Sequence, residues 1–289
     1  MGVQAVPAGS RVLRPLPAAA QLCLGIILVV GCVYPTQTIA DRAMTDPSSR
    51  GLDAASRDSR APQDARAPGT EASRPYPRPR RFGTSVLGRP LRAYRIGDRR
   101  SAVTAVLLGN MHGNEPAGVR LVNAVRADPR LRGVDLWVVP TMNPDGLAAD
   151  TRQNAHGVDL NRNWAHRWRP QTGPYDSGPR PFSEPETRAM RRFLNRVDPQ
   201  FVVSFHQPLH GVDSDAAKNR HLLNRLATDL RLPKKPLRCS GVCHGTMTGW
   251  YNAHHSGSAI TVELGPQPSV GYLTGRGARG AVRSVLGHF

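Results

Sequence analysis

The chain has 289 residues and a formal net charge of +18, because 39 lysines and arginines outnumber 21 aspartates and glutamates. Hydrophobic residues make up 39% of it, whereas glycine (28) and proline (26) are abundant. This composition excludes a multi-span membrane protein, a collagen and a disulfide-dense miniprotein. The basic residues are scattered, without a block of like charge or a ladder of aromatic residues, so we expect no nucleic-acid partner.

The first 31 residues have the organisation of a lipoprotein-type export signal. Two arginines precede an uncharged stretch whose apolar centre, residues 22–33, reads LCLGIILVVGCV. This centre is short for a membrane span, which needs about 20 residues. The segment VVGC resembles a bacterial lipobox, which predicts a lipid anchor on Cys32. Cleavage after Ala40, giving a secreted protein, and an uncleaved anchor are the alternatives. Each of the three places the remainder outside the cytoplasm.

Residues 32–81 are predicted to form a disordered tether. They are rich in proline, alanine, serine, aspartate and arginine and show almost no aliphatic periodicity. Such a segment cannot bury enough apolar surface to offset the entropy lost on ordering. We therefore expect one folded domain over residues 82–289, which is long enough for a single hydrophobic core.

Apolar strands and helical segments alternate along this domain. Strands are expected at 90–96, 102–109, 134–140, 201–205 and 259–264, and helices at 115–127, 183–197, 215–230 and 277–287. Ser183 and Glu186 have the spacing of a capping box, with Pro185 in the first helical turn. The alternation predicts an α/β domain with a mostly parallel, mixed central sheet flanked by helices. A site in such a sheet lies at the carboxyl ends of the strands.

Candidate metal ligands stand at those strand ends. His112 and Glu115 follow the second strand, three residues apart at the entry to a helix, so they can share one face. His206 and Glu263 end two later strands. Two histidines and one carboxylate, with a second carboxylate nearby, suit a catalytic zinc that keeps one position open for water. A lone histidine after a strand is more often structural. The chain has only five glutamates, however, and two of them follow apolar strands, where a carboxylate needs a partner.

Further motifs lie between these residues. They are NPDG at 143–146, GVDLNRNW at 157–164 and FSEPET at 182–187, between HGNE at 112–115 and TVEL at 261–264. In this order and spacing they resemble the zinc metallocarboxypeptidase family over essentially all of 82–289. The chain is most similar to the short bacterial members, such as murein peptide amidases. The resemblance implies a zinc carboxypeptidase-like fold.

The resemblance also implies roles for seven residues. His112, Glu115 and His206 would be the ligands of one Zn²⁺ ion, and Glu263 would be the general base. Arg152 would be the arginine that polarises the scissile carbonyl. Asn161 and Arg162 would bind the substrate carboxylate. The chain departs from the family at the mobile tyrosine found about 22 residues before the base in digestive members, because Gly241 stands there. We expect Tyr251 to have a packing or rim role instead.

Cys239 and Cys243 lie four residues apart. In an exported protein this spacing predicts a disulfide, and a second metal site with His244 is the alternative. Asp145 and Asp159 are expected to make hydrogen bonds in turns and to metal-binding side chains.

The expected function is that of an extracytoplasmic zinc peptidase or amidase. It would hydrolyse an amide bond next to a free carboxylate in cell-wall (murein) peptides, with a peptide or muropeptide as substrate and the membrane as partner through Cys32. A zinc deacylase of N-acyl amino acids is one alternative, although its cytoplasmic setting fits poorly with the export signal. A non-catalytic wall-binding lipoprotein is the other, although it would not need the complete set of ligands and base.

Overall fold

The computed structural model describes residues 77–128, 131–215, 217–237 and 243–286. The predicted signal, Cys32, Ala40, Cys239 and most of the tether lie outside these residues. Within them, no helix has the length and apolar character needed to cross a membrane.

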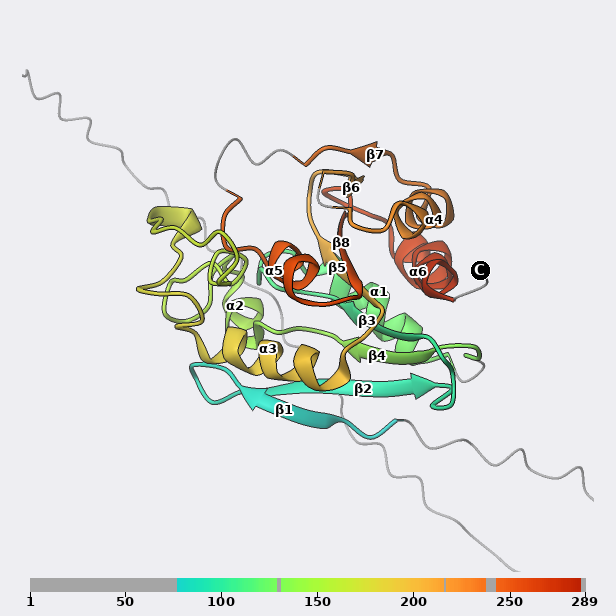
Figure 1. Ribbon diagram of the computed structural model, residues 1–289, viewed down its shortest axis with the longest axis horizontal. Helices are drawn as coiled ribbons and strands as arrows, with labels where there is room; N and C mark the ends of the chain where they lie inside the picture. Colours follow the sequence, from blue (N-terminus) through green and yellow to red (C-terminus); the bar gives the residue numbers. More distant parts are fainter. Residues whose placement is uncertain (1–76, 129–130, 216, 238–242, 287–289) are drawn as a thin grey trace, which may run out of the picture. The chain divides into compact units, whose positions relative to one another are not determined.

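An eight-stranded sheet forms the centre of the described residues, in the order β1-β2-β4-β3-β5-β8-β6-β7 (Figure 1). The strands are β1 Arg80–Thr84, β2 Pro90–Gly97, β3 Thr104–Leu108, β4 Asp135–Val139, β5 Phe201–His206, β6 Gly211–Asp213, β7 Lys234–Lys235 and β8 Ser258–Glu263. The four central strands β4, β3, β5 and β8 are parallel. Strands β1 and β2 pair antiparallel with each other, β2 pairs antiparallel with β4, and β6 pairs antiparallel with β8 and parallel with β7. The predicted mostly parallel, mixed sheet is confirmed.

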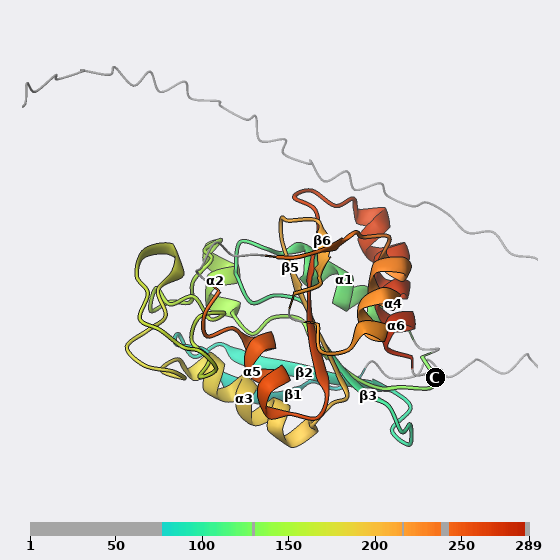
Figure 2. The same ribbon diagram turned by 45° about the horizontal axis from the view of Figure 1, so that its top comes forward.

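Helices cover both faces of this sheet (Figure 2). They are α1 Ala117–Arg126, α2 Pro144–Ala149, α3 Pro185–Val197, α4 Arg220–Leu230, α5 Met247–His254 and α6 Ala278–Val285. A π-helical segment, Tyr272–Gly277, leads into α6, and a short 3₁₀ turn spans Gly173–Tyr175. Helices α1, α4 and α6 lie on one face, and α3 and α5 lie on the other.

Each face of the sheet has its own hydrophobic core. On β5, Val203 and Phe205 pack with residues of α1, α4 and α6, whereas Val202 packs with residues of α3 and α5. Because both faces are buried, the central strands are apolar at nearly every position, which is why continuous apolar runs identified them.

The first strand begins two residues before the boundary expected between tether and domain. β1 starts at Arg80, and its pairing with β2 is antiparallel. Phe82 packs on Phe193 of α3, with ring centroids 4.8 Å apart, and the Arg80 guanidinium lies 5.5 Å from the centroid of the Trp137 ring. The last residues of the segment expected to be a tether, Arg80 and Arg81, therefore belong to the sheet.

The capping box expected at α3 is wrong. The helix begins at Pro185, two residues after the expected start, and ends at Val197 as expected. Ser183 Oγ donates to Glu184 Oε1 at 2.7 Å and does not cap the helix. Glu186 accepts a hydrogen bond from the Val86 backbone amide at 2.8 Å. The side-chain amide of Asn154 donates to both Glu184 and Glu186. The two carboxylates therefore join α3 to distant loops, a use that local spacing cannot reveal.

Helix α4 begins at Arg220, five residues later than expected. Asn219 caps it by accepting a hydrogen bond from the Leu222 amide at 2.9 Å. Upstream of the cap, Asp213 ends β6, and its carboxylate accepts from the Asp215 amide at 3.0 Å. Residues 211–215 thus form a strand followed by a bend, where part of a helix was expected.

Candidate active site

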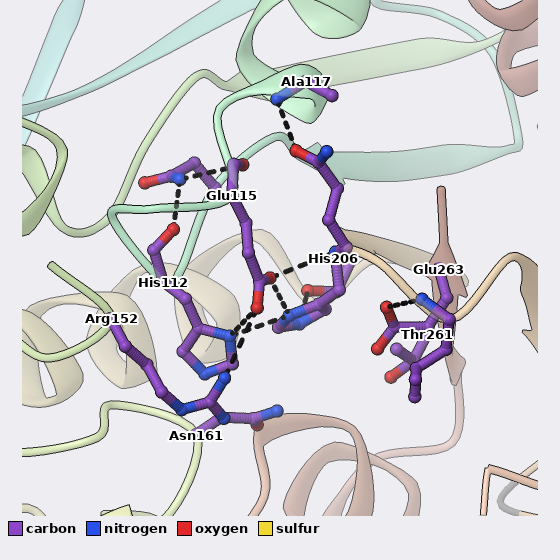
Figure 3. Close-up of polar contacts among 12 residues, drawn as sticks. His112, Glu115, Ala117, Arg152, Asn161, His206, Thr261 and Glu263 are labelled. Atoms are coloured by element: carbon purple, nitrogen blue, oxygen red, sulfur yellow. Dashed lines mark hydrogen bonds and ion pairs between the residues drawn. The ribbon is translucent and has the colours of Figure 1, made fainter. Parts of the chain in front are cut away.

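The carboxyl ends of three parallel strands bring the candidate residues together (Figure 3). His112 and Glu115 lie between β3 and α1, His206 is the last residue of β5, and Glu263 is the last residue of β8. Strand β5 pairs with β3 on one side and β8 on the other. Residues from three separate parts of the sequence therefore meet at one edge of the sheet.

The three predicted metal ligands form one compact cluster. His112 Nδ1 lies 2.9 Å from Glu115 Oε1, His206 Nδ1 lies 2.9 Å from Glu115 Oε2, and the two histidine Nδ1 atoms are 3.2 Å apart. All three side chains are buried, and their ligand atoms lie within 4.8 Å of one another. Two imidazole nitrogens and a carboxylate are a donor set that zinc prefers at catalytic sites, so the residues fit a zinc ion.

Both histidines are oriented through their second ring nitrogen. His112 Nε2 lies 3.0 Å from Asp159 Oδ1, and His206 Nε2 lies 3.2 Å from Ser204 Oγ. Such partners fix the ring and the tautomer of metal-binding histidines. Ser204 was not predicted, but its position two residues before His206 puts both on one face of a strand and could have pointed to it.

Asp159 and Glu115 are held as carboxylates. Burial opposes their ionisation, but His112 holds the pKa of both groups well below the usual range, with His206 adding to the effect on Glu115 and Arg152 to that on Asp159. Asp159 also accepts a hydrogen bond from the Asn161 amide at 2.8 Å. It is therefore ionised while it joins His112 to the loop that carries Asn161.

Glu263 is buried beside this cluster without belonging to it. Its Oε2 accepts from the Leu209 amide at 3.3 Å. Burial raises the pKa of Glu263 above its ordinary value; His206 opposes this shift, and the nearby Glu115 carboxylate adds to it. Thr261, two residues earlier on β8, also lines the cavity (Figure 3).

Arg152 is fixed by carboxylates at the side of the cluster. Its Nε and Nη2 donate to Asp159 Oδ2 at 3.0 and 2.8 Å, and Nη1 lies 3.4 Å from Glu115 Oε1. The guanidinium thus reaches the cavity next to the predicted metal ligands, where a polarised carbonyl oxygen would need positive charge.

Arg162 is a nearly buried cation, with 4% of its surface exposed. Nη1 donates to the Asn161 carbonyl at 2.8 Å, whereas Nε has no hydrogen-bond partner within the described residues. Burial lowers the pKa of Arg162, and Asp159 opposes the shift. Asn161 is oriented by the Met247 amide, which donates to its Oδ1 at 3.0 Å. A nearly buried guanidinium that lines a cavity is suited to bind an anionic group there.

All seven predicted site residues line one cavity of about 930 Å³: His112, Glu115, Arg152, Asn161, Arg162, His206 and Glu263. This volume is in the range of ligand-binding pockets.

Tyr251 and Trp250 lie outside this cavity lining. Tyr251 is fully buried, its hydroxyl donates to the Pro199 carbonyl, and its ring stacks on His255 with centroids 4.2 Å apart. Burial also raises its pKa. Trp250 packs on Trp164, with centroids 4.9 Å apart. Both residues therefore have packing roles in α5.

Cys243 lines the cavity and is disulfide-bonded. Its predicted partner Cys239 lies outside the described residues, so the pairing stays a prediction. Gly241, the position of the family's mobile tyrosine, lies outside them as well.

Comparisons by sequence identify relatives of this chain. The zinc carboxypeptidase family matches residues 76–209. Murein peptide amidase A from Escherichia coli (strain K12) is 34% identical over 190 residues, which cover 60% of this chain and 73% of that protein. Murein peptide amidase A from Vibrio campbellii is 34% identical over 202 residues, covering 65% of this chain and 79% of that protein.

Solved structures show the same fold. The murein-tripeptide amidase MpaA from Escherichia coli O157 superimposes with a TM-score of 0.63 at 28% identity, covering 77% of this chain and 98% of that one. Carboxypeptidase A from Helicoverpa armigera superimposes with a TM-score of 0.61 at 15% identity, covering 73% and 69% of the two chains. The second likeness concerns the fold alone.

Proposed function

The chain belongs to the zinc carboxypeptidase family of hydrolases, and we propose that it is an extracytoplasmic zinc-dependent amidase of murein peptides. The observation that carries this proposal is the single cavity that joins a His-Glu-His cluster, a separate buried glutamate and a nearly buried arginine. The named relatives that are murein peptide amidases support the substrate class.

His112, Glu115 and His206 would hold one zinc ion. When bound, zinc supplies Lewis-acid activation of water and of the amide carbonyl. The contacts of His112 with Asp159 and of His206 with Ser204 keep the two imidazole rings turned toward the same point. The protein's contribution at this point is a preformed set of ligands on rigid strand ends.

Glu263 acts as the general base and then as the general acid. It takes a proton from the water that attacks the scissile carbonyl carbon, and it delivers that proton to the amine nitrogen as the carbon–nitrogen bond breaks. Its raised pKa suits a group that must both accept and release a proton. Arg152 donates to the carbonyl oxygen, where negative charge develops.

Arg162 and Asn161 bind the free carboxylate next to the scissile amide. The planar guanidinium matches a carboxylate with two parallel charge-assisted hydrogen bonds, and the oriented Asn161 amide adds another donor. This pairing fixes the amide bond relative to Glu263, which turns a bimolecular encounter into a positioned reaction.

The place of action that we propose is the cell envelope. Its support comes from the export signal and the lipobox at Cys32, which would anchor the protein to the membrane at the end of a tether. A Cys32→Ala variant should move the protein from the membrane fraction to the soluble fraction of cells. An unchanged distribution would remove Cys32 from this role.

The reaction can be identified from the released amine. The zinc-loaded full-length protein is incubated with muropeptides and with a library of ordinary peptides, and the products are identified by mass spectrometry. We expect release of diaminopimelate from the D-glutamyl bond. Release of ordinary C-terminal residues would make the protein a general carboxypeptidase, and release of simple acyl groups from N-acyl amino acids would make it a deacylase.

A further inference from the structure

Tyr175 is an exposed aromatic residue on the wall of the candidate active site. It ends the 3₁₀ turn Gly173–Tyr175, keeps 38% of its surface exposed and lines the cavity. The guanidinium carbon of Arg152 lies 5.2 Å from the centroid of its ring, and that of Arg162 lies 5.3 Å from it. One ring therefore contacts both arginines of the proposed mechanism.

The two arginines need such a contact because they repel each other. Besides burial, the charge of Arg152 lowers the pKa of Arg162, whereas Asp159 opposes that shift. Asp159 accepts two hydrogen bonds from the Arg152 guanidinium, whereas Arg162 donates to the Asn161 carbonyl. The negative face of an aromatic ring attracts cations, so Tyr175 can offset the repulsion at both groups.

Hydrogen bonds fix the ring in this place. Gln153, the neighbour of Arg152, donates through Nε2 to the Gly173 carbonyl at 2.8 Å. On the other side of Tyr175, the Asp159 amide donates to the Asp176 carbonyl at 2.8 Å. The loop that carries the tyrosine is thus anchored on both sides to the segment between Arg152 and Arg162.

We propose that Tyr175 is a positioning residue whose ring holds the Arg152 and Arg162 guanidinium groups in place, so that Arg162 receives the substrate carboxylate next to the scissile amide while Arg152 faces the scissile carbonyl. The proposal rests on the function proposed above and adds a residue to it. Tyr175 acts through its ring and not through its hydroxyl, and its effect on substrate binding falls on the carboxylate that Arg162 receives.

Binding to an inactive protein tests the proposal without turnover. The full-length zinc-loaded chain carries Glu263→Gln and, in parallel, Tyr175→Phe or Tyr175→Leu. Two probes are titrated by calorimetry: the tripeptide L-alanyl-γ-D-glutamyl-diaminopimelate, and its analogue with a carboxamide in place of the carboxylate next to the scissile amide. We expect Tyr175→Leu to weaken binding of the acid probe by about 5- to 30-fold, since two cation–π contacts are lost. The affinity for the carboxamide probe should be unchanged. Tyr175→Phe should bind both probes within about two-fold of the parent, because the ring remains.

Other outcomes would overturn the proposal. If the affinities for the acid and the carboxamide probe fall equally, or if the affinity for the acid probe does not change, Tyr175 has no part in carboxylate recognition. A phenylalanine variant as weak as the leucine variant would assign the effect to the hydroxyl. Loss of zinc from the leucine variant would make Tyr175 a support of the metal cluster instead.

A second measurement separates this proposal from the proposed function. If the parent with Tyr175 binds neither probe, the proposed function fails. The rates at which phenylglyoxal modifies Arg152 and Arg162, followed by peptide mass spectrometry in the absence of substrate, then decide on Tyr175. Faster modification in Tyr175→Leu than in Tyr175→Phe supports the positioning role, and equal rates contradict it.

Discussion

His206 and Glu263 are partners in register on the neighbouring parallel strands β5 and β8. One is a predicted metal ligand and the other the proposed base. Their backbones are therefore fixed relative to each other by a sheet whose strands are buried on both faces. Such placement on rigid strands holds reacting groups more precisely than placement on loops.

The first prediction concerns the base. Glu263→Gln keeps the size of the side chain but removes its ability to take a proton, so turnover should fall by roughly 10²–10⁴-fold. Zinc content, measured by mass spectrometry of the metal, should be unchanged. Glu186→Gln is the control, because it changes a buried glutamate outside the cavity lining and should retain turnover. Full activity of the Glu263 variant would assign the base role to another group.

The second prediction concerns the metal ligands. His112→Ala removes one of three donors, so the purified variant should contain much less zinc than the parent protein. His254→Ala is the matched control, because that histidine is exposed and lies outside the His-Glu-His cluster. Equal zinc content in the two variants would count against His112 as a ligand.

The third prediction concerns the group behind the ligand. Asp159→Asn leaves a neutral side chain against His112 and Arg152, so zinc affinity should fall by about 10- to 100-fold. Competition with a chelating dye measures this change. Asp198→Asn removes an exposed aspartate that contacts His255, away from the cluster, and should not alter affinity. An unchanged affinity in Asp159→Asn would mean that orientation of His112 does not depend on this carboxylate.

Strong local signals made the centre of the fold predictable from the sequence. Strands β3, β5 and β8 are buried on both faces and appear as apolar runs, and each is followed by, or ends on, a candidate ligand or base. The short elements were not predicted. β7 consists of Lys234 and Lys235 and exists through its pairing with β6, while α2 follows the Asn143 cap in a segment that also has the composition of a turn.

The candidate site was predictable to a similar degree. The motifs identified the seven predicted site residues that line the cavity. Contacts between distant loops could not be predicted from the spacing of residues in the sequence. Tyr175 lies 13 positions after Arg162 in a loop without periodicity, and only the folded chain brings its ring against that arginine. The use of Glu184 and Glu186 in loop contacts was missed for the same reason.

The fourth prediction concerns stability near the site. Asp145 is buried and accepts hydrogen bonds from Ser85 Oγ, the Leu87 amide and Arg89 at 2.8, 2.9 and 2.7 Å. Asp145→Asn should lower the free energy of unfolding by about 1–3 kcal/mol at pH 7, since hydrogen bonds to a charged acceptor are lost. Urea denaturation measures the change. Asp98→Asn is the control, because among the described residues its carboxylate accepts an exposed hydrogen bond from the Arg100 amide, two residues along the chain.

The same aspartate gives this stability a pH dependence. Burial would raise the pKa of Asp145, but the Leu87 amide and Arg89 hold it below the ordinary value. Its stabilising contribution is therefore complete above the unfolded pKa of about 3.9 and is lost as pH falls through the folded pKa. The difference between parent and Asp145→Asn should shrink on acidification. A difference that grows would contradict the assignment.

The most direct test of zinc-dependent hydrolysis is a titration of activity with metal. The full-length protein is freed of metal with a chelator and supplied with increasing zinc, while release of diaminopimelate from a murein tripeptide is followed by mass spectrometry. Hydrolysis should be absent without metal, rise with added zinc and level off at one ion per chain. Hydrolysis that persists in the metal-free protein, or that zinc fails to restore, would contradict the proposed function.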